Sequence, residues 1–218
     1  MDKTKTGGIA LGYTVAVIAV FAGILLIPAS RQWFSTMSSA QPYIMGFFKF
    51  ALLATAGEIL ALLTATKQWQ LPKKFLGKMI VWGFLGIIIS LAFQVFSYGT
   101  AGAIEHGYLP GKGSKFVSAL MTSITMNVMF APAFMSFHRI TDKMFNLRAE
   151  GRKVGFVQAV GEVDWKDFVS FVLFKTLPIL WVPAHTISFL LPPEYRIIFA
   201  AALSMLLGVI LVLATKKK

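Results

Sequence analysis

Polar side chains that interrupt long apolar runs are the residues of this sequence best placed to do chemistry. The candidate polar or pore-lining residues are Lys49, Glu58, Asn127, Lys175, His185 and Ser188. An ionisable group inside a bilayer is costly, so it usually faces a protein interior or a water-filled cavity. These residue types bind small polar or charged molecules by hydrogen bonds and ion pairing, so they predict a solute-handling site.

Their spacing limits how they can combine. Lys49 and Glu58 are nine residues apart, which places them on opposite faces of a helix and prevents their pairing. Glu58 and Lys175 lie about 9 and about 10 Å from the inner ends of their apolar runs by helical rise. Equal depth predicts a direct or water-bridged contact between them. Lys49 either faces the interior or snorkels to the headgroups, and His185 is either a structural hydrogen-bonding residue or a ligand.

The elements that must hold these residues are helices. More than half of the 218 residues are hydrophobic and only 14% are charged. The apolar residues gather in blocks of roughly 20, the length that crosses a hydrocarbon layer of about 30 Å. The six blocks are 9–28, 43–64, 75–96, 116–137, 168–191 and 195–213. We therefore expect an all-α, polytopic transmembrane helix bundle of about six spans, forming one domain over 1–218.

The distribution of charge predicts the orientation. With a cytoplasmic N-terminus, fifteen of the 21 Lys and Arg residues lie in inner segments and four in outer loops. This asymmetry follows the positive-inside rule and places both termini in the cytoplasm. The net charge of +12 lies in short runs between apolar blocks, which argues against nucleic acid as a partner. The basic inner face is suited to anionic lipid. We expect the first block to be retained as a helix, because it is longer than the core of a signal peptide.

Three segments carry further structural expectations. Pro178 and Pro183 both delete helical donors, which predicts irregular geometry between Thr176 and His185 in the fifth block. Gly83 and Gly86 predict close contact with a neighbouring helix. The inner segment 138–166 is either an amphipathic helix on the inner surface or a flexible charged loop, and 98–115 either extends the third helix or dips into the interface.

Motifs for covalent or metal chemistry are absent from the sequence. There is no G-x-S-x-G, H-E-x-x-H or phosphate-loop motif, and the three histidines have no acidic companion at motif spacing. The chain has no cysteine, which excludes disulfides and thiolate metal sites. We expect no catalytic residues, no cofactor and no metal site, and the chain is not expected to be an enzyme.

The stretch from Trp181 to Arg196 resembles the signature of the peroxisomal-membrane-protein-twenty-two / Mpv-seventeen family. That signature reads W-P-x-x-Q-x-x-N-F, followed by V-P-x-x-aromatic-Arg. The residues that carry the resemblance are Trp181, Pro183 (displaced by one position), Phe189, Pro192, Tyr195 and Arg196, with His185 and Ser188 in place of Gln and Asn. Upstream positions that resemble the family pattern are Pro42, Lys49, Thr55, Gly57, Glu58, Asn127 and Pro132, with Glu58 and Asn127 each in place of Asp.

The resemblance covers about 42–213 and leaves 1–41 as an extra N-terminal helix and link. Members of that family are small organellar membrane proteins, and some are thought to form channels for small solutes. The resemblance thus implies a channel or transporter-like protein for small polar or ionic solutes, in a divergent prokaryotic relative. We expect a bacterial cell membrane, with an organellar membrane as the alternative. The alternative function is a non-transporting structural protein that binds lipid or a partner, and an oligomer is compatible with either.

Overall fold

The computed structural model describes residues 3–215, with side chains described for 6–203, 205 and 206. All regular secondary structure in this range is helical. The helices are α1 Lys3–Leu26, α2 Pro28–Ala40, α3 Pro42–Thr66, α4 Phe75–Glu105, α5 Lys115–Met129, α6 Ala131–Ala149, α7 Phe156–Val160, α8 Trp165–Asp167, the π-helix η1 Phe168–Trp181, α9 Val182–Leu190 and α10 Pro193–Thr215. The expected all-α class is confirmed.

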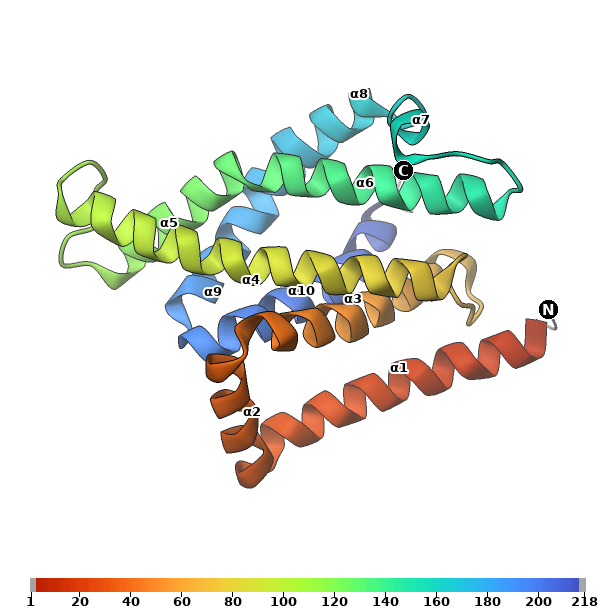
Figure 1. Ribbon diagram of the computed structural model, residues 1–218, viewed down its shortest axis with the longest axis horizontal. Coiled ribbons are helices and arrows are strands. Elements are labelled where there is room, and N and C mark those ends of the chain that lie inside the picture. Colours follow the sequence, from red (N-terminus) through yellow and green to blue (C-terminus); the bar gives the residue numbers. More distant parts are fainter. Residues whose placement is uncertain (1–2, 216–218) are drawn as a thin grey trace. The chain divides into compact units, whose positions relative to one another are not determined.

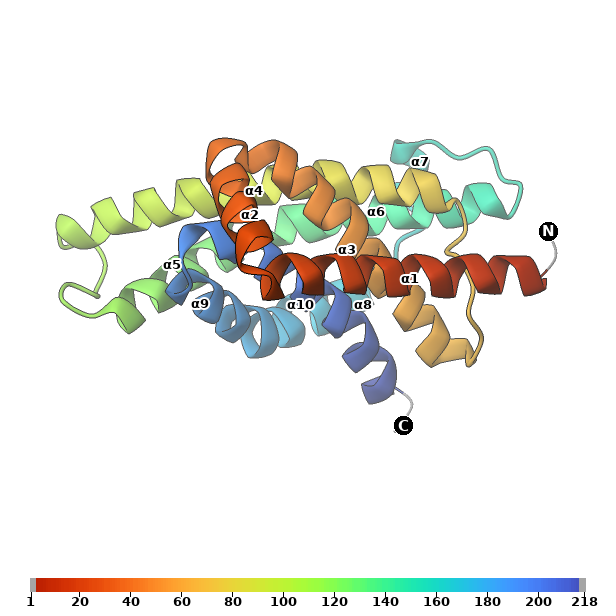
Figure 2. The same ribbon diagram turned by 90° about the horizontal axis from the view of Figure 1, so that it is seen from below.

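Contacts divide the chain into two compact units, one of 1–87 with 197–218 and one of 88–196. In the first unit, α1 and α3 run in opposite directions, and α2 crosses between them (Figures 1 and 2). The sequence predicts only a link between the first two apolar blocks, whereas the structure has the helix α2 there. Pro28 opens α2 and Pro42 opens α3, positions where a missing N–H costs nothing.

Glycines allow α3 and α4 to pack closely within the first unit. A Cβ atom added at Gly86 would collide with the carbonyl oxygen of Gly46, and one at Gly83 would collide with the ring of Phe47. Small residues let helix backbones approach and gain dispersion contact, which matters where water gives no driving force. The predicted close contact at Gly83 and Gly86 is confirmed. Gly57 has the same role, since its added Cβ would lie 2.5 Å from the Met205 Cα atom in α10.

The second unit is built around the packing of α5 against α9. The helices α5 and α6 form a pair bent by 48° at Phe130. Pro132 stands in the first turn of α6 and cannot donate to the preceding turn, which explains the break. The segment 138–166 is not a free loop, because α6 continues to Ala149 and packs against the residues that follow it. The buried cluster there is made of Ile140, Leu147, Val154, Ala159 and Val163.

The fifth apolar block has the predicted irregular geometry, and it extends further than expected. Residues 168–181 form a π-helix that contains Pro178, and an α-helix resumes at Val182, next to Pro183. The hydroxyl of Thr176 donates to the carbonyl of Phe171, five residues earlier, at 3.1 Å. Because a π-helix bonds i to i+5, this side-chain bond follows the local repeat.

Four of the described helical spans are long and apolar enough to cross a membrane, and the bent α5–α6 pair brings the number to five. Large apolar side chains point outward on them, among them Val95 and Phe174 at 55% and 74% exposure. The chain thus has the helices of an integral membrane protein. The sixth block coincides with α10, whose side chains lie partly outside the described set, so six spans stay a prediction. The region 98–115 does extend the third helix, to Glu105.

Candidate functional site

The second unit contains a hollow of about 850 Å³, which is the candidate site. It lies between the end of α4, the start of α5 and the turn from α9 to α10. The residues that line it and are used below are Ser97, Glu105, Lys112, Lys115, Thr122, Phe189 and Arg196. Glu105, Lys112 and Lys115 are exposed, whereas Thr122 and Phe189 are buried. The exposed residues therefore form the mouth of the hollow and the buried ones its deep end.

Arg196 is held rigidly in the hollow. Its Nε atom donates to the carbonyl of Leu191 at 3.0 Å, and Nη2 donates to the carbonyl of Phe189 at 3.2 Å. Its Nη1 atom donates to the hydroxyl of Ser97 at 3.0 Å. The guanidinium also lies over the Phe189 ring, 5.6 Å from the ring centroid. These contacts come from α4, α9 and the turn before α10, so three parts of the unit set the orientation of one cation.

An aromatic layer separates the hollow from a buried polar cluster. Phe189, which lines the hollow, stacks on Phe93 with ring centroids 4.8 Å apart. Phe93 in turn meets the His185 ring edge-on at 5.6 Å. The indole of Trp181 stacks on this histidine at 5.2 Å. His185 therefore packs against aromatic rings of α4 and η1, and its polar contact points towards α5.

That direction leads to Asn127, which is fully buried. Its Nδ2 atom donates to the carbonyl of Ser123 at 2.8 Å. His185 Nδ1 lies 3.0 Å from Nδ2 and 3.2 Å from Oδ1 of Asn127, so it accepts from Nδ2 in one neutral tautomer and donates to Oδ1 in the other. Ser123 donates to the carbonyl of Val182 at 2.7 Å. The structure thus brings together two sequence-predicted residues, Asn127 and His185, through the packing of α5 on α9. Among the described residues, the buried Trp181 Nε1 donor has no hydrogen-bond partner.

Lys49 lies in the first unit and is 2% exposed. Its Nζ atom donates to the hydroxyl of Ser38 in α2 at 2.8 Å and lies 4.3 Å from the centroid of the Phe34 ring. Of the two readings left open by the sequence, the interior one is therefore correct and snorkelling is wrong. The cation–π contact and the hydrogen bond hold α2 against α3.

Glu58 takes a different ion-pair partner from the predicted one. Its Oε1 atom lies 3.4 Å from Nζ of Lys78, which is 8% exposed in the first turns of α4. Lys175 is exposed on η1. The structure therefore pairs Glu58 with Lys78, and the predicted contact with Lys175, which belongs to the other unit, stays a prediction. The signal for Lys78 is local, because α3 and α4 are consecutive helices, and a long lysine side chain near the start of one reaches a carboxylate near the end of the other.

The remaining predicted residues serve the frame of the site. The hydroxyl of Ser188 is fully buried and donates to the carbonyl of Ala184 at 3.2 Å, within its own helix. Pro183 stands in the first turn of α9, and Pro192 lines the hollow just before α10. Of the motif residues, Phe189, Pro192 and Arg196 share the hollow. The hydrogen bond of Ser188 stays within α9 and does not involve the residues that line the hollow.

Sequence reasoning missed the mouth of the hollow. Lys112 and Lys115 were counted only as outer-loop charges, and Ser97 and Glu105 were not considered. The available signal was the glycine-rich loop between two apolar blocks, with Gly111 and Gly113 at positive φ values of 137° and 81°. A loop that folds back on itself beside a helix start brings its charges together.

The arrangement offers a fixed guanidinium, two exposed ammonium groups and hydroxyls around one space, with a polar cluster beyond an aromatic layer. Such groups bind and orient polar molecules. Among the side chains described, no three His, Asp or Glu residues are grouped as metal ligands. Comparison with known proteins gave no family profile, no curated protein and no solved structure that matches the chain.

Proposed function

We propose that this membrane protein is a channel or transporter-like protein for small polar or ionic solutes. The observation that carries the proposal is the hollow, whose deep end is one aromatic layer from the Asn127–His185 pair. A polar pair between apolar helices, with Asn127 fully buried and His185 half-buried, is costly unless it is satisfied or used. The orphan Trp181 donor beside that pair supports the same reading, as does the resemblance to the peroxisomal-membrane-protein-twenty-two / Mpv-seventeen family.

In this proposal the hollow is an outer vestibule and the Phe93–Phe189 stack is its constriction. The π-helix η1 then lies on the inner side of the constriction. Short π-helical segments recur at functional sites, because the extra residue per turn shifts side chains and frees backbone groups. The Lys and Arg asymmetry supports an orientation with both termini on the cytoplasmic side, and the proposed location is a bacterial cell membrane or, as the alternative, an organellar membrane.

Solute flux in reconstituted liposomes tests the proposal. Wild-type protein is expected to raise the entry of a small neutral polyol or of ions above that of protein-free vesicles. Phe189→Ala removes one ring of the stack and is expected to raise flux further. Phe174→Ala is the matched control, because that ring is 74% exposed on η1 and lies outside the hollow. Equal flux in protein-free, wild-type and Phe189→Ala vesicles would overturn the proposal.

The second candidate is a non-transporting protein that holds anionic lipid. It is favoured by α7, where Val157 is 80% exposed and Phe156 is 39% exposed, close in sequence to Lys153 and Lys166. An exposed apolar pair flanked by cations is suited to an anionic membrane surface. Flux-negative protein that retains anionic lipid through purification, and loses it when Val157 becomes Asp, would favour this candidate.

A further inference from the structure

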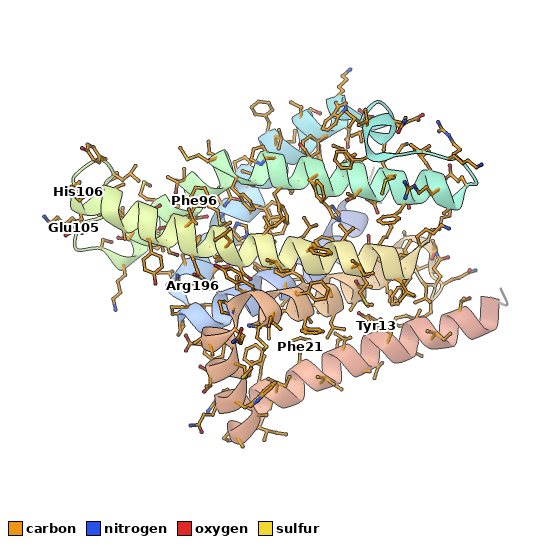
Figure 3. All side chains as sticks on the ribbon, viewed as in Figure 1. Tyr13, Phe21, Phe96, Glu105, His106 and Arg196 are labelled. Atoms are coloured by element: carbon orange, nitrogen blue, oxygen red, sulfur yellow. The ribbon has the colours of Figure 1, made fainter. Side chains whose placement is uncertain are left out.

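The hollow carries an excess of positive charge around one fixed arginine. Arg196, Lys112 and Lys115 line it together with a single acidic residue, Glu105. Glu105 lies at the far end of α4, well separated from Arg196 (Figure 3). Ser97, which holds Arg196, precedes Glu105 by eight residues, about 12 Å of helix. Glu105 therefore belongs to the mouth, and Glu194, the carboxylate that interacts electrostatically with Arg196, makes no ion pair with it among the described contacts.

The hydrogen bonds of Arg196 also leave donors for a ligand. A guanidinium has five N–H donors, and its three hydrogen bonds in the structure go to two carbonyls and a hydroxyl. None of these partners is a carboxylate, so no protein anion neutralises the group through them. Two N–H donors therefore remain, on a side chain whose orientation is already set. Pre-organisation of this kind lowers the entropy lost when a ligand binds.

The start of α5 adds to the positive potential. Ser114 caps this 15-residue helix by accepting from the backbone N–H of Val117 at 3.3 Å. Ser114 and Lys115 both line the hollow. The other first-turn N–H groups and the helix dipole favour negative charge there. The hollow thus has a cationic helix start on one wall and a fixed guanidinium on another.

We infer that the hollow is a binding site for small oxyanions, with Arg196 as its anchor. Carboxylate and phosphate groups match the planar fork of a guanidinium and gain charge-assisted hydrogen bonds. A volume of about 850 Å³ accepts such a group with an attached polar body or its water. Small oxyanions are then the solute class of the proposed function. The binding site rests on that function only where transport is concerned. The same phosphate chemistry is offered by a free anion and by a lipid headgroup.

Binding to purified protein tests the site without transport. Inorganic phosphate and acetate are titrated into delipidated protein in detergent at constant ionic strength, with chloride as the reference anion. Arg196→Gln is expected to weaken phosphate binding about ten- to hundredfold, because a hydrogen bond to a charged group is lost. Lys112→Gln with Lys115→Gln alters only exposed side chains and is expected to weaken it about three- to tenfold. Arg31→Gln, which removes one exposed charge outside the hollow, is the control.

The outcomes separate the alternatives. Specific binding of phosphate or acetate that falls in the hollow variants, and not in Arg31→Gln, supports a free anion. Phospholipid that co-purifies with the wild type and is lost in the hollow variants supports the headgroup as the source. Absence of both, or binding equal to that of chloride in every variant, overturns the inference. Anion binding without flux would overturn only the proposed transport, and flux without anion preference or anion binding would overturn only the anion site.

Discussion

The ion pair between Glu58 and Lys78 is the most direct quantitative test of the packing in the first unit. The Nζ and Oε1 atoms are 3.4 Å apart, and the two side chains are 10% and 21% exposed for Lys78 and Glu58. At an effective dielectric constant of about 20, the Coulomb attraction at this distance is about 5 kcal/mol. Desolvation opposes it, and loss of one partner from a fully buried pair costs about 3–5 kcal/mol. Partial exposure lowers this, so Glu58→Gln is expected to cost about 2–3 kcal/mol.

A double-mutant cycle isolates the pair. Lys78→Met alone removes the cation, and the double variant removes the unpaired charge that either single change leaves behind. The losses in free energy of unfolding are therefore expected to be non-additive by about 1–2 kcal/mol. Unfolding is measured in mixed micelles by circular dichroism, at fixed detergent composition.

Lys175→Met is the matched control, because Lys175 is exposed on η1. Its loss combined with Glu58→Gln is expected to add within about 0.5 kcal/mol. Additive losses for Glu58→Gln with Lys78→Met would refute the assignment of the pair. A larger coupling to Lys175 than to Lys78 would restore the partner first expected from depth.

Two further predictions follow from helix contact and from charge. Gly86→Ala drives a Cβ into the neighbouring helix and is expected to cost about 1–3 kcal/mol of unfolding free energy in micelles. Gly99→Ala on the same helix meets nothing within 4 Å and is expected to be neutral or slightly stabilising, so equal losses would refute the close contact. The hydrogen bond from Arg152 lowers the pKa of Glu162, so its stabilisation is present above the ordinary carboxyl pKa and is lost as pH falls through the lowered value. Acidification should lower the melting temperature of the wild type more than that of Glu162→Gln, and identical pH profiles would contradict this.

The sequence by itself determined the helical elements and the local irregularities. Apolar runs long enough to cross a bilayer must form helices there, because unsatisfied backbone groups are too costly in lipid. Pro178 and Pro183 predict an irregular helix, because each lacks the N–H that would form a backbone hydrogen bond in its own turn. Gly83 and Gly86 predict a close helix contact for an equally local reason, the absence of a side chain. The sequence does not say which neighbouring helix each glycine contacts.

Tertiary structure alone decided which polar groups meet. Equal depth in the membrane suggested Lys175 as the partner of Glu58. Depth does not say towards which neighbouring helix a side chain points, and the packing of α3 on α4 brings Lys78 to Glu58. The burial of Lys49 depends on α2 folding over it, which composition does not reveal. The hollow needs the end of α4, the start of α5 and the turn before α10 to converge on Arg196. Periodicity reports which side of a helix is apolar, whereas a site depends on distances between segments that are far apart in the chain.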